Sequence, residues 1–157
     1  MKNRRNHVST ETEDLIIRNN IILHCSDDGV YVNNSKNTVL LNNTLYNTGG
    51  ISMRFPETSV VAINNIMTGE IHKRDGATAL VDKGNTWLPR SFLTDAEDFD
   101  AFFVAPSIAN FTLQVSPSEF ESVPLPAEWM SDTDFCGNKV FGKSFAGAVS
   151  DSANCFY

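Results

Sequence analysis

Short apolar runs broken by paired asparagines recur along the first half of this 157-residue chain. The arrangement is found in DLIIRNNIIL (14–23), TVLLNNTLYN (38–47), VVAINNIMTG (60–69) and, more weakly, ALVDKGNTW (79–87). The aligned asparagines are Asn20, Asn43, Asn65 and Asn85. They are 23, 22 and 20 residues apart, and a nearly fixed period of this size predicts repeating units that stack on their neighbours.

Each unit contains a further strand-like segment. These segments are GVYVN (29–33), GISMRF (50–55) and EIHKRD (70–75), and Gly, Asn or Asp stands beside each of them, as expected at turns. A strand, a crossover helix and a second strand need about 30 residues, which is more than one unit contains. We therefore predict three short strands per coil, wound into a parallel β-helix.

The alignment also predicts where side chains point. One apolar column comprises Ile16, Val39, Val61 and Val81, and a second comprises Ile22, Leu45, Met67 and Trp87. We expect both columns to face inward. The asparagine pairs are expected at a bend, because Asn tolerates left-handed backbone angles and successive side-chain amides can stack into a hydrogen-bonded ladder.

The coil segments resemble those of right-handed parallel β-helix proteins related to pectate lyases. The resemblance rests on LIIRNNIIL, DGVYVNN, NTVLLNNTLYN, GGISMRF and VVAINNI. In the second half, FFVAPSIANFTLQVSPSEF (102–120) and DFCGNKVFGKSFAGAV (134–149) are similar to the segments that follow the last coil in bacterial members. The resemblance implies an all-β fold, a short right-handed parallel β-helix of about three to four coils with an irregular β-rich C-terminal cap.

Composition suits a single domain of modest size. Residues 1–12 read as a polar leader, residues 13–88 as the coils, and residues 89–157 as an acidic connection and a cap packed with the coils. Residues 1–90 carry 10 basic and 9 acidic side chains, whereas residues 91–157 carry 2 and 10. The acidic second half argues against a nucleic-acid partner.

Nothing in the sequence indicates a membrane span or a secretory signal. No apolar run reaches 18 residues, and the polar start MKNRRNHVSTETEDL has no hydrophobic stretch. The localisation therefore stays open, although relatives of the resembled fold are usually extracellular. Cys25 reads as a small buried residue, while Cys136 and Cys155 can pair in an oxidising compartment.

The third strand of each coil supplies the candidate binding side chains. In register, the outward positions are Tyr31, Ser52 and His72 in one column and Asn33, Arg54 and Arg74 in the next. Stacked arginines beside an aromatic ring suit an acidic polysaccharide, and a solvated face is the plainer interpretation. The predicted substrate-binding residues are Tyr31, Asn33, Arg54, His72 and Arg74.

Metal and catalytic assignments have less support. Asp27 and Asp28 could contribute to a Ca²⁺ site, but acidic residues are ordinary at turns, and DTDFCGN (132–138) lacks the closing Glu of a Ca²⁺ loop. No acid and base pair stands out. We therefore assign no metal, cofactor or catalytic residue.

Two functional hypotheses remain. The favoured one is a small non-catalytic β-helix module that binds glycan or self-associates, and the alternative is a lyase or hydrolase acting on an acidic glycan. The sequence also predicts a homo-oligomer, because the first coil presents Ile16, Ile22 and strand edges with only a polar leader before it. Folding of that leader over the coil, with Val8 as an anchor, is the alternative.

Overall fold

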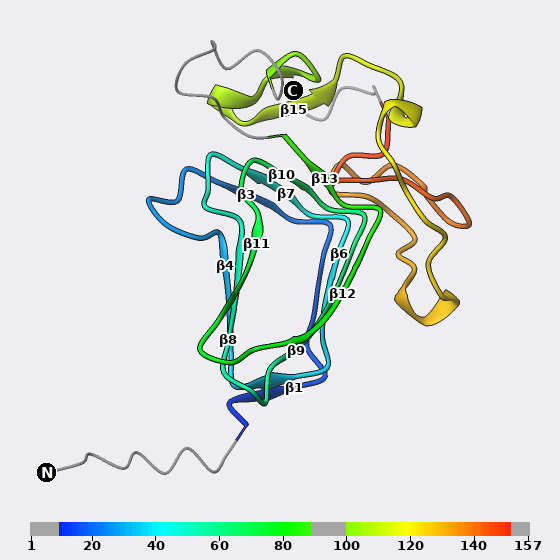
Figure 1. Ribbon diagram of the computed structural model, residues 1–157. Helices are drawn as coiled ribbons and strands as arrows, with labels where there is room; N and C mark the ends of the chain where they lie inside the picture. The colour runs from blue at the N-terminus through cyan, green and yellow to red at the C-terminus, as the bar shows by residue number, and fades with distance from the viewer. Residues whose placement is uncertain (1–9, 89–99, 152–157) are drawn as a thin grey trace, which may run out of the picture.

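The computed structural model describes residues 10–88 and 100–151, and it confirms a parallel β-solenoid (Figure 1). Three parallel sheets run along the stack of coils. In spatial order the first contains β2 (Ile16–Arg18), β6 (Thr38–Leu41), β9 (Ser59–Ile63) and β12 (Ala79–Lys83). The second contains β3 (Ile21–Leu23), β7 (Thr44–Tyr46), β10 (Ile66–Met67) and β13 (Thr86–Trp87), and the third contains β4 (Val30–Asn33), β8 (Ile51–Arg54) and β11 (Ile71–Arg74).

Smaller elements complete the chain. A two-stranded parallel pair joins β1 (Thr12–Glu13) to β5 (Ser35–Lys36) near the start of the solenoid. After the coils, β14 (Phe103–Ala105) and β15 (Asn110–Leu113) form an antiparallel pair. Of three short 3₁₀ turns, η1 (Pro106–Ile108) lies between β14 and β15, and η2 (Pro117–Glu119) and η3 (Ala127–Trp129) follow β15. Residues 1–9 and most of the predicted acidic connection lie outside the described residues.

The asparagine ladder is present at the bend between the first and second sheets. The Oδ1 atom of Asn43 accepts from the backbone N and Nδ2 of Asn20, at 3.1 and 3.2 Å. Asn65 receives the same two bonds from Asn43, both at 2.9 Å, and Asn85 receives them from Asn65 at 2.7 and 2.8 Å. Each coil is therefore tied to the next by a pair of bonds to a single amide oxygen.

The first asparagine of each pair has a different role. Asn19, Asn42 and Asn64 adopt left-handed backbone angles, with φ of 55°, 50° and 57°. Gly84 takes this position in the last coil, with φ of 57°, and a Cβ atom there would lie only 2.5 Å from Asn64 Oδ1. The pair is thus a bend residue followed by a ladder residue.

The interior of the solenoid is apolar. Its buried side chains include Leu40, Leu45, Ile51 and Met53, and Ile22 and Met67 pack with them. Burying a side chain of this kind stabilises a fold by roughly 1.5–3 kcal/mol. The second predicted column therefore faces inward as far as Met67, while Trp87 continues its register but is half exposed on the last coil.

The other predicted inward column was wrong, because Ile16, Val39, Val61 and Val81 face outward. The inward positions are those of Ile17, Leu40 and Ala62, one residue further along each strand. The C-terminal segment covers the middle of this outward apolar column, whereas Ile16 and Val81 at its two ends are exposed. Val123, Leu125 and Trp129 pack there against Val39, Leu41, Val61 and Ile63.

Candidate functional site

The C-terminal segment, residues 100–151, covers the outer side of two of the three sheets (Figure 1). On the second sheet, Tyr46 and Ile66 pack with Phe103, Phe111 and Phe120 of the segment. On the first sheet the cover is the Val123, Leu125 and Trp129 cluster. Neither apolar cluster includes an outward side chain of β4, β8 or β11, so the third sheet presents the bare face among the described residues.

Three asparagines fasten this cover to the coils. Asn19 Nδ2 donates to the carbonyl of Thr133 at 2.8 Å, and Asn42 Nδ2 donates to that of Phe145 at 2.5 Å. Asn64 donates to the Val123 carbonyl at 2.9 Å and accepts from the Val123 backbone N at 2.8 Å. The bend residues thus recognise the backbone of the segment.

The strand register on the bare face aligns the predicted side chains. Tyr31 of β4 pairs with Ser52 of β8, which pairs with His72 of β11. Asn33, Arg54 and Arg74 form the neighbouring column in the same strands. Alternate residues of these strands face inward, since Val30, Val32, Ile51, Met53 and Ile71 belong to the interior cluster. The five predicted binding residues therefore share one face, while their binding role stays a prediction.

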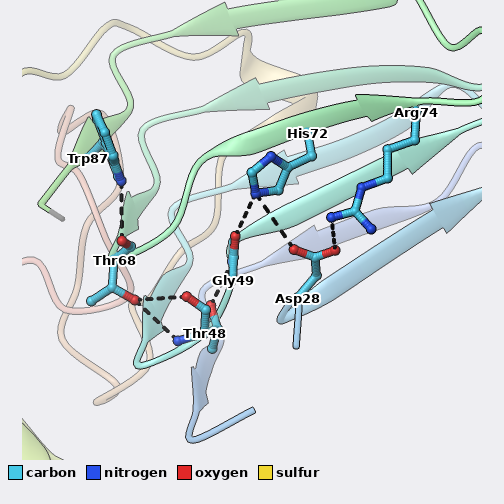
Figure 2. Close-up of polar contacts among 8 residues, drawn as sticks. Asp28, Thr48, Gly49, Thr68, His72, Arg74 and Trp87 are labelled. Atoms are coloured by element: carbon cyan, nitrogen blue, oxygen red, sulfur yellow. Dashed lines mark hydrogen bonds and ion pairs between the residues drawn. The ribbon is translucent and has the colours of Figure 1, made fainter. Parts of the chain in front are cut away.

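A buried carboxylate from the bend before β4 reaches two of these side chains. Asp28 Oδ2 lies 3.4 Å from Arg74 Nη2, and Asp28 Oδ1 lies 3.9 Å from His72 Nε2 (Figure 2). His72 Nε2 also donates to the Gly49 carbonyl at 3.1 Å. There is no room for a side chain at Gly49, because a Cβ atom there would lie 2.7 Å from Asp28 Oδ1. Asp28 therefore links the first coil to β11, the last strand of this sheet.

The other arginine has a separate carboxylate partner. Arg54 Nε lies 2.5 Å from Asp75 Oδ2, and Asp75 follows β11 in a turn with φ of 52°. The Arg54 guanidinium carbon lies 5.2 Å from the centre of the Phe55 ring, within the range of a cation–π contact. Arg54 is thus held by one ion pair and one aromatic ring.

Tyr31 stands half exposed at the first-coil edge of the face. A hydrogen bond between its hydroxyl and the Asp27 side chain lowers the pKa of Asp27 and raises the pKa of Tyr31. The bond orients the phenol ring, since it fixes the far end of the side chain. Tyr31 is the large exposed aromatic side chain on this face among the described residues.

Several buried polar atoms of this region have no hydrogen-bond partner. Five buried side-chain oxygens in the described part of the chain lack one, and three of them belong to Asp28, Asn33 and Ser52. Buried polar groups in native proteins are nearly always satisfied, by water or ligand where protein does not suffice. The bare face is therefore less completely satisfied by the protein itself than the ladder, where each buried amide is bonded.

Metal and nucleophile chemistry find little support in the geometry. Among residues 10–88 and 100–151, no group of three or more His, Cys, Asp or Glu side chains is placed to hold a metal ion. Asp28, a Ca²⁺ candidate in the sequence, is paired with Arg74 instead. Ser52 is next to His72 in register but fully buried, so a substrate cannot reach its hydroxyl.

The DTDFCGN segment is a structural loop in which one carboxylate organises the backbone. Asp134 accepts from the backbone N of Cys136, Asn138 and Ser150, each at 2.9 Å. Cys136 is disulfide-bonded, while Cys25 is a free, partly buried thiol. Cys155, the partner considered in the sequence, lies outside the described residues.

Sequence reasoning found the columns but missed their carboxylate partners. The sequence places Asp28 at a turn and Asp75 at the end of a strand-like segment, and their pairing with Arg74 and Arg54 depends on contacts 46 and 21 residues apart in the chain. For Asp75 the usable signal was its position directly after Arg74 at the end of β11, whereas Asp28 precedes β4, a strand without an arginine, and had no such signal.

Comparison with family models, with curated proteins and with solved structures found no match for the chain. Within the described residues, no helix is both long and apolar enough to cross a membrane.

Proposed function

We propose that this chain is a non-catalytic β-helix module that binds glycan on the outer face of β4, β8 and β11. One observation carries the proposal: the C-terminal segment covers the other two sheets, and the face left bare carries a half-exposed tyrosine beside two arginines and a histidine. The resemblance of the coils to pectate-lyase-like proteins supports the same ligand class. The proposal includes that this chain is related to that group.

The physical basis is a flat, ridged surface. Neighbouring strands lie about 4.8 Å apart, so the side chains of β4, β8 and β11 form a regular row along the solenoid. Tyr31 offers a ring face for stacking, and Arg54 and Arg74 offer planar donors that match carboxylates. Because a row of this kind suits a polymer better than a compact ligand, we propose an acidic polysaccharide as the partner.

The first experiment measures binding by calorimetry. The ligands are oligogalacturonate, oligoalginate and chondroitin oligosaccharides, with neutral cello-oligosaccharides for comparison. Tyr31→Ala is expected to abolish measurable binding, because it removes the stacking surface. Phe141→Ala is the matched control, since Phe141 is an exposed aromatic side chain of the C-terminal segment. Equal loss in both variants, or no binding of any glycan by the unsubstituted chain, contradicts the proposal.

The same ligands test the catalytic alternative. A lyase cleaving an acidic glycan produces unsaturated ends that absorb in the ultraviolet, and a hydrolase produces new reducing ends. We expect neither signal, with or without added Ca²⁺. Turnover that disappears in His72→Ala or Arg74→Ala would replace the binding module by an enzyme.

A second candidate function is self-association through the first coil, and a difference between the two ends of the solenoid favours it. The inward positions of the first coil are Ile17, Ile22 and Val30, all apolar and partly buried. At the other end of the same two sheets, Ile71 of β11 and Leu80 of β12 also pack inward, but the inward positions in register with Met53 and Ala62 are the charged Lys73 and Asp82. Inward charges oppose the addition of another strand at that end, whereas the apolar end permits it.

We therefore propose a two-fold homodimer through the first coil, since head-to-tail stacking would place Ile17 against Asp82. Ile16 and Val81 occupy one column at opposite ends and are 43% and 42% exposed, which makes them a matched pair. Ile16→Lys is expected to shift the protein to monomer in sedimentation equilibrium, and Val81→Lys is expected to leave the dimer intact. A monomeric unsubstituted chain at tens of micromolar contradicts this interface.

A further inference from the structure

The two arginines of the bare face are neutralised in different ways. The Arg74 and Asp28 side chains are 46% and 2% exposed, so this pair has one buried partner. The Arg54 and Asp75 side chains are 39% and 44% exposed, so that pair stands in solvent. Exposed ion pairs contribute little to stability, whereas removing the partner of a buried charge is costly. Asp75 can therefore leave its arginine easily, and Asp28 cannot.

Arg54 stays in place without Asp75. Its guanidinium lies over the Phe55 ring, and its strand is held on both sides by β4 and β11. Asp75 contacts it through Nε, while a guanidinium carries five N–H donors in a rigid fork. A ligand carboxylate that approaches in the plane of the fork can make two parallel bonds where Asp75 makes one through Nε.

The position of Arg54 relative to Tyr31 fits the proposed ligand. Arg54 is in the strand next to Tyr31 and two residues further along it, since Tyr31 is in register with Ser52. Strand spacings of about 4.8 Å across and about 3.3 Å per residue place the two Cα atoms about 8 Å apart. A sugar stacked on the Tyr31 ring can therefore have its own carboxylate, or that of the next residue of the polymer, at Arg54.

We propose that Arg54 is the carboxylate-binding residue of this face and that Asp75 is its internal competitor. The inference rests on the proposed glycan-binding function and adds its specificity. A uronate carboxylate replaces Asp75 on Arg54, whereas Arg74 stays paired with Asp28, whose other oxygen lies 3.9 Å from His72 Nε2. A neutral glycan gains nothing from this exchange, so the face discriminates acidic from neutral chains through a single residue.

Removal of the competitor gives the first test. Asp75→Asn keeps the size of the side chain, removes its charge and is expected to tighten oligogalacturonate binding about two- to fivefold at low salt, the range set by one exposed ion pair. Binding of a neutral oligosaccharide is expected to stay unchanged. Asp132→Asn makes the same change in net charge on the C-terminal segment and is expected to have no effect, because Asp132 is exposed and adjoins Thr133, which is bonded to Asn19 at the bend between the first and second sheets.

Replacement of Arg54, the proposed carboxylate-binding residue, gives the second test. Arg54→Gln is expected to remove the preference for acidic over neutral oligosaccharides and the salt dependence of binding. Arg74→Gln is expected to lower the melting temperature, because it leaves Asp28 buried and unpaired, while the acidic preference stays. Unchanged or weaker oligogalacturonate binding by Asp75→Asn, or loss of the preference in Arg74→Gln alone, overturns the assignment.

A direct probe separates this inference from the proposed function. The Nε–H signal of Arg54, assigned by its loss in Arg54→Gln, is followed by NMR as free galacturonate is added. A saturable shift that begins at lower concentration in Asp75→Asn supports the exchange even if no polymer binds, and no shift overturns it. Polymer binding that depends on Tyr31 but not on Arg54 would keep the glycan-binding function and remove this inference.

Discussion

At the scale of the residue, the two asparagines of each pair have different roles, one in the ladder and one at the bend. The second of each pair forms the predicted ladder, and this could be inferred from the period and from the chemistry of Asn alone. The first was predicted only to tolerate the bend. Its bonds to the C-terminal segment could not be inferred, because Asn19 and Thr133 are 114 residues apart and nothing in the local sequence specifies the pairing.

The asparagine ladder predicts that alanine substitutions at different positions lower the free energy of unfolding by different amounts. Asn43 is buried and bonds to Asn20, Asn65 and the Ile17 carbonyl, so Asn43→Ala is expected to lower the free energy of unfolding by about 2–3 kcal/mol. Asn20 is the exposed end of the ladder, and Asn20→Ala is expected to cost less than about 1 kcal/mol. Urea unfolding of both variants measures the difference. Equal losses would show that burial of the ladder contributes little.

The Asp134 loop predicts a dependence on pH. Burial opposes ionisation of Asp134, but bonds from Ser150 and Asn138 outweigh it and lower its pKa. A carboxyl with a lowered folded pKa stabilises fully above its unfolded value of 3.8 and loses this contribution as the pH falls through the folded value. The melting temperature is therefore expected to fall more between pH 5 and pH 2 in the unsubstituted chain than in Asp134→Asn. Parallel curves would contradict this.

At the scale of the element, the strands were located better than their faces. The period and the turn residues fixed β4, β8 and β11 and their outward columns, because on that sheet one face is apolar and the other polar. On the sheet of β2, β6, β9 and β12, both faces are apolar. Alternation then carries no information, and the column of Val39 and Val61 was placed inward although the C-terminal segment packs on it.

This correction changes the expected result of a charge substitution. Leu40→Asp places a carboxylate in the interior of the solenoid and is expected to unfold it, since burying an unpaired charge costs several kcal/mol against a total stability of about 5–15 kcal/mol. Val61→Asp faces Val123 and Trp129 and is expected to loosen residues 120–130 while the coils stay folded. Hydrogen exchange resolves the two. Loss of protection throughout β6 and β9 in Val61→Asp would restore the inward assignment.

At the scale of the whole molecule, the sequence predicted an all-β solenoid with a C-terminal cap packed with the coils, and the structure adds which sheets the cap covers. In the structure, Phe103 and Phe111 of this segment pack with Tyr46 and Ile66, which are outward residues of the coils. The candidate face was predictable as a set of columns. Its selection as the bare face was not, because that depends on which sheets the segment covers.

The cysteines give a prediction for the complete chain. Cys136 is disulfide-bonded and Cys25 is free, so one thiol per chain is expected on titration of the denatured, unreduced protein. After reduction the sequence provides three. Cys25→Ser is expected to remove the thiol signal of the unreduced sample. Three thiols before reduction would show that the C-terminal segment folds without its cross-link.

The asparagine contacts tie the C-terminal segment to three particular bends of the solenoid. The segment meets the third coil at Val123, the first at Thr133 and the second at Phe145, with one asparagine amide at each step. The C-terminal segment therefore fits a set of three stacked bends, whereas the cap of an open-ended repeat protein fits any number of units. Duplicating residues 44–65 would insert a bend between two of these contacts and leave its asparagine without a carbonyl of the segment, so we expect an inserted coil to be tolerated only if the C-terminal segment is lengthened with it.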